Sequence, residues 1–279
     1  MEYSLFCKCY AEFLGVFIFI FCGTMQANVY DIMQPDGLTH SALTHGFATI
    51  VIIFTLGHIS GGHFNPVVSW AATLIGKLPI WHLPFYMLSQ FSAGFCACLL
   101  SACLQRQRDF IVWTPIGDIE NAVASSSIRA GYNRRNNSTW QKSIMLTTQL
   151  AATSSGATLL NLSNDWWEGI ISESITTYFF VTPATFSKRN FFSNPAAPFI
   201  IGMMAMVDIF ATASITGTAM NPVRALSPNI VAEIVLSSKT IPNNFWTFHY
   251  IYWVGPYIGS SVAVITYKFF LSRNGRFVN

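Results

Sequence analysis

Two short segments, far apart in the chain, carry the same pattern of a glycine-containing turn followed by Asn-Pro. They are residues 61–67 (Gly-Gly-His-Phe-Asn-Pro-Val) and residues 217–224 (Gly-Thr-Ala-Met-Asn-Pro-Val-Arg). Each follows a long apolar segment and opens a shorter one, 66–75 or 222–235, which is too short to cross a bilayer. Proline suits the first turn of a helix. Both short segments are therefore predicted to be re-entrant half-helices, which persist at membrane depth only when buried in protein or lining water.

The composition indicates a protein built for a lipid solvent. Hydrophobic residues make up 52% of the 279 residues and charged residues 10%, whereas soluble domains carry about 25% charged residues. The net charge of +3 is small and scattered, which argues against a nucleic-acid partner. At about 20 residues per crossing, six segments are long and apolar enough to span: residues 9–29, 39–58, 79–104, 167–186, 195–214 and 245–271.

The order of these segments predicts an inverted repeat. Each half of the chain has three spans with a half-helix after the second, and each half places a glutamate, Glu12 or Glu173, in its first span. Three spans are an odd number, so the two halves must have opposite orientations in the membrane. We expect an all-α membrane protein with six transmembrane helices and two re-entrant half-helices. It would form one channel domain, with a first repeat at 1–104, a long connecting loop at 105–166 and a second repeat at 167–279.

The distribution of basic residues in short loops predicts that both termini are cytosolic. The long central connection is then extracellular, although it contains several arginines, because long loops largely escape the charge rule. Three sequons in this connection fit an outside location and make Asn136, Asn137 and Asn161 candidates for glycosylation.

Asn65 and Asn221 are the predicted centre of a pore. Each would cap the amino end of a half-helix, where the helix dipole contributes about half a positive charge. If the two ends meet near the membrane midplane, the amide hydrogens point into the lumen and turn each passing water so that its own hydrogens point away. Such an arrangement interrupts a proton wire and repels cations.

Three charged residues at membrane depth need an explanation. Arg224 lies one helical turn beyond Asn221, where it can face the lumen and reject cations; the alternative is that it reaches the outer lipid headgroups. Glu12 and Glu173 could relay protons, as in a secondary transporter with inverted repeats. Their matching positions favour the other interpretation, in which each carboxylate accepts hydrogen bonds from the non-helical backbone that precedes a half-helix.

These features together resemble the aquaporin family. The residues that carry the resemblance are Ala11-Glu12-Phe13, residues 57–66, Gln90 and residues 217–224. A closer likeness is to the aquaporin-8 branch. The register from Asn65 and Asn221 places a four-residue selectivity filter at His45, Ile209, Thr218 and Arg224. A histidine, an isoleucine, a small residue and an arginine resemble the pattern of that branch.

The resemblance implies a passive channel for water, with ammonia and hydrogen peroxide as further permeants and with protons and ions excluded. It implies a homotetramer in a lipid bilayer, with the plasma membrane favoured over an internal one. It implies no enzyme activity, no cofactor and no metal site.

The chain also departs from the family pattern. Valine replaces the usual alanine after each Asn-Pro, at Pro66-Val67 and Pro222-Val223, which adds methyl groups where the half-helices pack. These valines keep open a non-conducting structural or adhesive protein. A glycerol-type channel is a further alternative, against which Ala225 stands where glycerol-conducting relatives carry aspartate. Thr218 replaces a frequent mercury-sensitive cysteine.

Overall fold

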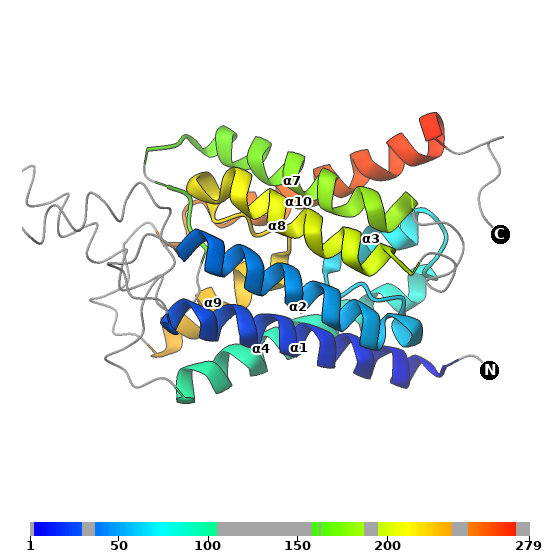
Figure 1. Cartoon of the computed structure of the whole chain (residues 1–279), viewed down its shortest axis with the longest axis horizontal. Coiled ribbons are helices and arrows are strands. Elements are labelled where there is room, and N and C mark those ends of the chain that lie inside the picture. The colour runs from blue at the N-terminus through cyan, green and yellow to red at the C-terminus, as the bar shows by residue number, and fades with distance from the viewer. Residues whose placement is uncertain are drawn as a thin grey trace, which may run out of the picture.

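Long helices run side by side, and two short helices enter the bundle from opposite ends and point toward each other (Figure 1). The computed structural model describes residues 3–29, 37–104, 158–161, 163–186, 195–235 and 245–271. The long helices are α1 (Leu5–Val29), α2 (Gly37–Ser60), α4 (Leu83–Leu104), α7 (Trp166–Phe186), α8 (Ala197–Thr216) and α10 (Ile251–Ile265). The short helices are α3 (Pro66–Leu74) and α9 (Pro222–Val235). The predicted all-α fold with two half-helices is therefore confirmed.

Two of the long helices have extensions of a different type. A single 3-10 turn (Ile80–His82) precedes α4, and α10 continues as a π-helix (Thr266–Leu271). Four of the described helices are long and apolar enough to cross a membrane by length and composition alone: α1, α2, α4 with its 3-10 turn, and α8. The remaining two lie below that threshold for different reasons. Helix α7 carries Glu168, Glu173 and many hydroxyl side chains, and α10 has 15 residues before the π-helix begins.

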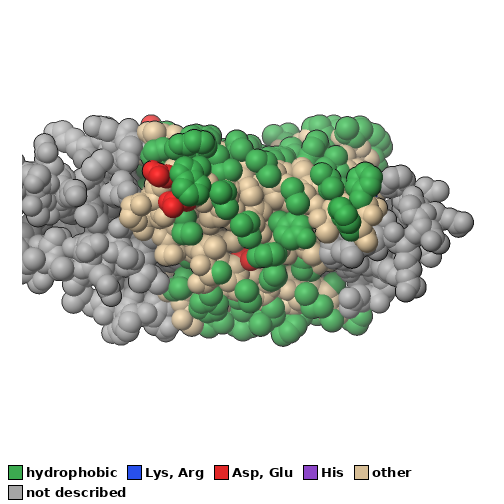
Figure 2. All heavy atoms as spheres, turned by 90° about the horizontal axis from the view of Figure 1, so that it is seen from above, with side chains coloured by type: hydrophobic (Ala, Val, Ile, Leu, Met, Phe, Trp, Pro, Cys, Tyr) green, Lys and Arg blue, Asp and Glu red, His purple; other side chains and the backbone are tan. Residues whose placement is uncertain are grey.

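The bundle is apolar on its outer faces and also buries charged and polar side chains among the apolar residues of its interior. Large apolar side chains lie exposed along the outer faces of the helices, among them Phe47, Val51 and Phe54 of α2 and Ile171, Ile175 and Phe179 of α7. Figure 2 shows that hydrophobic side chains cover much of one such face. The interior holds fully buried Glu12, Gln90 and Glu173. This distribution suits a multi-pass protein surrounded by lipid.

The two halves of the chain meet where α2 packs against α8, through two glycines in equivalent positions. Gly46 lies 19 residues before Asn65, and Gly202 lies 19 residues before Asn221. A Cβ atom on Gly46 would come within 2.8 Å of the Gly202 carbonyl oxygen, and one on Gly202 within 2.6 Å of the Gly46 carbonyl oxygen. Small residues allow membrane helices to approach this closely, so the contact fixes how the repeats dock.

The start of α1 and the end of the π-helix lie at the same end of the bundle (Figure 1). The two ends lie together because the chain runs the length of the bundle an even number of times. That this end faces the cytosol stays a prediction. Residues 105–157, which include the sequons at Asn136 and Asn137, lie outside the described part of the chain.

Candidate pore

Asn65 and Asn221 lie at the point where α3 and α9 meet. Each side-chain oxygen accepts a hydrogen bond from the backbone N–H two residues on, of Val67 or Val223, at 3.0 Å. Each side-chain nitrogen donates to the loop of the other repeat: Asn65 to the Met220 carbonyl at 2.8 Å and Asn221 to the Phe64 carbonyl at 3.1 Å. An amide nitrogen has two hydrogens, so each asparagine has one more N–H than these bonds use.

Glu12 holds the backbone that leads into α3. Its carboxylate accepts hydrogen bonds from the backbone N–H of His63 at 3.0 Å and of Phe64 at 2.6 Å. The Ser60 hydroxyl donates to it at 2.6 Å, and the Gln90 amide donates at 2.8 Å. Because these donors occupy both carboxylate oxygens, the arrangement suits a structural acceptor for loop N–H groups that no helix satisfies.

Glu173 makes the equivalent contacts before α9. It accepts from the backbone N–H of Ala219 at 2.9 Å and of Met220 at 2.8 Å, and from the Thr216 hydroxyl at 2.6 Å. Each repeat also has a tyrosine hydroxyl in an equivalent contact: Tyr86 donates to the Ser60 carbonyl, and Tyr252 donates to the Thr216 carbonyl. The glutamine contact of Glu12 has no counterpart among the described contacts of Glu173.

The two loops share an unusual backbone. Gly61 and Gly217 have φ values of 99° and 77°, which a residue with a side chain rarely adopts. Phe64, Thr218 and Met220 also have positive φ, near 50°. Such conformations cost about 1–3 kcal/mol each and persist only where surrounding contacts fix them. The glutamate hydrogen bonds supply those contacts, so loop shape and carboxylate depend on each other.

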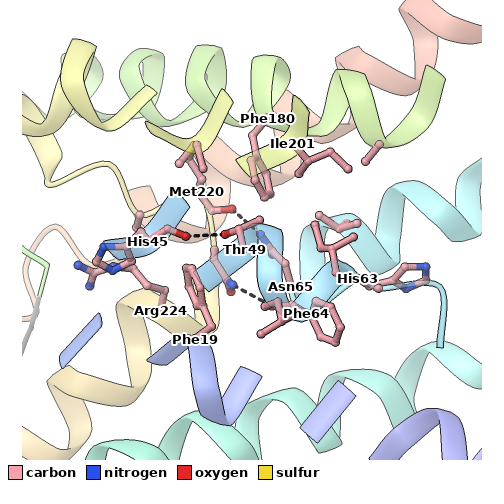
Figure 3. Close-up of a pocket in the computed structure, with 18 of the residues that line it drawn as sticks. Phe19, His45, Thr49, His63, Phe64, Asn65, Phe180, Ile201, Met220 and Arg224 are labelled. Carbon is pink, nitrogen blue, oxygen red and sulfur yellow. Dashed lines mark hydrogen bonds between the residues drawn. The ribbon is translucent and has the colours of Figure 1, made fainter. Parts of the chain in front are cut away.

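A narrow cavity of about 50 Å³ runs past both asparagines. Figure 3 shows His45 and Arg224 at one end of this cavity and His63 at the other, with Asn65 between them. A second cavity of about 330 Å³ adjoins it at the His63 end and is lined also by His58 and Lys77. We call the first cavity the lumen and the second the inner vestibule. Inner refers to the end of the bundle where α1 begins, and outer to the opposite end, which carries the filter residues. The asparagine side chains thus border a cavity inside the bundle.

The four predicted filter residues all line the lumen. The Nδ1 atom of His45 lies 2.8 Å from the Ser41 carbonyl oxygen, so Nδ1 carries the hydrogen and Nε2 is an acceptor when the ring is neutral. Phe19 contacts the same ring edge to face, with centroids 5.4 Å apart. Ile209 and Arg224 are 4% and 7% exposed, and the Thr218 hydroxyl lies 2.7 Å from that of Thr212.

The two valines of the motifs are buried and do not line the lumen. Val67 and Val223 are both 0% exposed, and neither is among the residues that line the lumen or the inner vestibule. The extra methyl groups of these valines are therefore not among the groups that line either cavity. Val223 belongs to the largest group of buried apolar residues and packs against Gly94 of α4.

Asn161 has a structural role that conflicts with glycosylation. Its side chain is 7% exposed, and its nitrogen, the atom that a glycan would modify, donates to the Ser214 carbonyl at 3.0 Å. Its backbone N–H donates to the Ile215 carbonyl at 2.9 Å. These bonds tie the end of the connecting loop to the segment before the second motif. Glycosylation of Asn161, which would have to break these contacts, stays a prediction.

Sequence reasoning missed several residues that line the lumen or shape it. Ser60 and Thr216 each bridge a glutamate to a loop N–H, since their hydroxyls accept from Gly62 and Thr218 at 3.1 Å. Phe180 lines the lumen opposite Phe64 (Figure 3). The signal for them was the repeat itself, because Ser60 and Thr216 both lie five residues before a motif asparagine.

Comparison with known proteins identifies the family. A profile described as "Major intrinsic protein" matches residues 2–267. The chain belongs to the major intrinsic protein family, which includes the aquaporins. Members of this family are passive channels and not enzymes. Family membership and the apolar helices both indicate an integral membrane protein that crosses the bilayer several times.

Named relatives of this major intrinsic protein include aquaporin-8 from two rodents. The chain is 31% identical to aquaporin-8 of Notomys alexis over 264 residues, which cover 94% of this chain and 81% of that protein. It is 32% identical to aquaporin-8 of Mus musculus over 249 residues, covering 89% and 76%. A more distant relative is aquaporin TIP1-2 of Musa acuminata, 25% identical over 266 residues, covering 92% and 83%.

Among solved structures, the chain is similar to the aquaglyceroporin from Plasmodium falciparum. The TM-score is 0.67 at 19% sequence identity, with 95% of this chain and 96% of that chain covered. At this identity the likeness shows a shared fold and carries no statement about the solute.

Proposed function

We propose that this chain is a passive channel for water that also conducts ammonia and hydrogen peroxide and excludes protons and ions. One observation carries the proposal: two asparagine amides border the same lumen at the amino ends of facing half-helices, and each retains an N–H beyond its bond to the opposite loop. A water oxygen that accepts from both amides has its hydrogens turned away in both directions along the file. That orientation interrupts proton transfer.

The filter end supports a preference for small neutral solutes. Arg224 is a buried cation in the first turn of α9, where it adds to the positive end of the helix dipole. Cations are repelled there, whereas water, ammonia and hydrogen peroxide are uncharged. Ile209 and Phe19 give the lumen apolar walls beside His45 and Arg224. A solute at the filter can therefore form hydrogen bonds on only part of its surface. The lumen of about 50 Å³ has room for a short file of water-sized molecules.

The alternatives gain no support from the geometry. The buried valines, which kept open a non-conducting structural or adhesive protein, lie away from the lumen. Ala225 and the bulky Ile209 argue against a glycerol-type channel. A homotetramer in the plasma membrane, with cytosolic termini, stays a prediction from the family resemblance.

Light scattering from proteoliposomes tests the proposal. Vesicles with the purified protein should shrink in response to an osmotic step faster than empty vesicles, and should show methylammonium uptake at high pH, where the neutral amine is present. A pH-sensitive dye inside the vesicles should report no added proton flux. Water permeability equal to that of empty vesicles, with folded protein confirmed by circular dichroism, would contradict the proposal.

A further inference from the structure

The inverted repeat gives every filter residue a counterpart on the other side of the asparagine pair. His45 lies 20 residues before Asn65, and Ile201 lies 20 residues before Asn221. Ile209 lies 12 residues before Asn221, and Ile53 holds that place in the first half. Gly62 corresponds to Thr218, three residues before the asparagine. Val68 corresponds to Arg224, three residues after it. The counterparts Ile53, Gly62, Val68 and Ile201 are defined here as the inner ring.

All four inner-ring residues line the lumen. Three of them, Gly62, Val68 and Ile201, also line the inner vestibule. The inner ring therefore lies where a cavity of about 330 Å³ narrows into one of about 50 Å³. The outer filter offers an imidazole, a hydroxyl and a guanidinium, whereas the side chains of the inner ring are wholly apolar. The two ends of the lumen thus differ in chemistry although they are equivalent in the fold.

Phe180 adds a further apolar side chain at this end, where His63 is the polar one. It lies seven residues after Glu173, as Phe19 lies seven residues after Glu12, and both phenylalanines line the lumen. Phe19 contacts the outer-filter residue His45. Figure 3 shows Phe180 beside Ile201, the counterpart of His45. Phe180 also packs against three separate groups of buried apolar residues, which contain Ile201, Val68 and Ile209 respectively. Phe180 is thus a lumen-lining side chain in contact with apolar groups from both repeats.

We propose that Phe180 and the inner ring form a second constriction that excludes polyols, so Phe180 is a specificity-determining residue of the channel. This inference rests on the proposed channel function. A water in the file keeps hydrogen bonds to the waters before and after it. A polyol such as glycerol carries a hydroxyl on each carbon, and the side chains of the ring offer no partner to them; at this end the imidazole of His63 is one polar group for several hydroxyls. Burying a hydroxyl without a partner is costly.

If two constrictions lie in series along the lumen, the glycerol permeability of single and double variants should differ in a specific way. Opening one of them leaves glycerol limited by the other, whereas opening both removes the limit. The test therefore compares wild type, His45→Ala, Phe180→Ala and the double variant in proteoliposomes, with water and glycerol permeability measured for each. We expect each single variant to change glycerol permeability little, and the double variant to exceed either single variant by ~10-fold. Phe179→Ala in the His45→Ala background is the matched control, because Phe179 precedes Phe180 on α7 and faces outward.

Several outcomes separate this inference from its alternatives. Glycerol permeability as high in His45→Ala as in the double variant would overturn it, and so would an equal gain from Phe179→Ala. If Phe180→Ala does not fold, Ile201→Ala on α8 replaces it with the same expectation and the same refuting result. If wild type conducts no water, the proposed function fails by that measurement alone. A water flux gained by Phe180→Ala would then support the constriction, and no gain would refute it.

Discussion

Val223 fills the space that Gly94 leaves between α9 and α4. A Cβ atom added to Gly94 would lie 2.4 Å from the Val223 Cγ1 atom and 2.5 Å from the Ser227 hydroxyl oxygen. The valine that departs from the family motif, together with Ser227 one turn further along α9, is thus accommodated by a glycine on the facing helix. The departure is accommodated in the packing between α9 and α4.

Gly94→Ala should therefore destabilise the protein. Overpacking a well-filled core costs about 1–3 kcal/mol, and the neighbours here lie on a half-helix held from several sides. Thermal unfolding in detergent should show a lower midpoint than wild type. Cys96→Ala, on an exposed face of the same helix, is the control and should leave the midpoint unchanged. Adding Val223→Ala to Gly94→Ala should recover part of the loss, and a double variant no more stable than Gly94→Ala would contradict the contact.

Glu173→Gln should disrupt the loop before α9. The carboxylate accepts three hydrogen bonds there. In the glutamine variant, the side-chain NH2 group would face one of the N–H or O–H groups that donate to the carboxylate. An unsatisfied buried group costs about 1–3 kcal/mol, so folded yield and water permeability should both fall. Glu168→Gln, near the exposed start of the same helix, is the control. A Glu173→Gln protein that folds and conducts like wild type but loses proton-coupled uptake would instead support the relay interpretation.

The sequence predicted the parts of the pore that the repeat marks twice. The asparagines, the glutamates and the order of spans and half-helices could be found because each has a copy at a matching distance in the other half. The filter positions came from the family register. The asparagines and the filter residues line one lumen, and each glutamate accepts hydrogen bonds from the loop before a half-helix.

Features that depend on contact between distant helices could not be predicted. The pairing of Gly94 with Val223 joins residues 129 positions apart, and no local pattern reports it. Asn161 matched a glycosylation sequon, yet its burial depends on the carbonyl groups at the end of α8. The inner ring could have been found by applying the filter offsets to the other half, since only the symmetry of the two motifs is needed.

Gly23→Ala should close the outer filter. The His45 Nε2 atom would lie 2.6 Å from a Cβ atom on Gly23, so the imidazole has to move away from α1. His45 borders the lumen, and the shift reduces the space for water. We expect water permeability to fall, and Gly23→Ala with His45→Ala to restore it because the displaced ring is gone. A fall that the double variant does not restore would point to damage in α1 packing.

Arg224→Ala should admit protons or small cations. The variant removes the fixed positive charge at the filter end, while the asparagines and the half-helix dipoles remain. Proton flux across proteoliposomes, followed with an internal pH-sensitive dye, should rise above the wild-type value. Phe47→Ala, which alters an exposed side chain two residues from His45, is the control. A proton flux equal to that of wild type would remove Arg224 from the barrier to cations.

Thr218→Cys should make water flow sensitive to mercury, whereas wild type should be insensitive through the lumen. All six cysteines lie in the described part of the chain, and none is among the residues lining the lumen or the inner vestibule. Thr218 lines the lumen beside the filter, so a mercury ion on a cysteine there would obstruct the file. Osmotic shrinkage should slow after mercuric chloride in the variant and recover with a thiol reductant. Equal inhibition of wild type would direct attention to the half-buried Cys22 of α1.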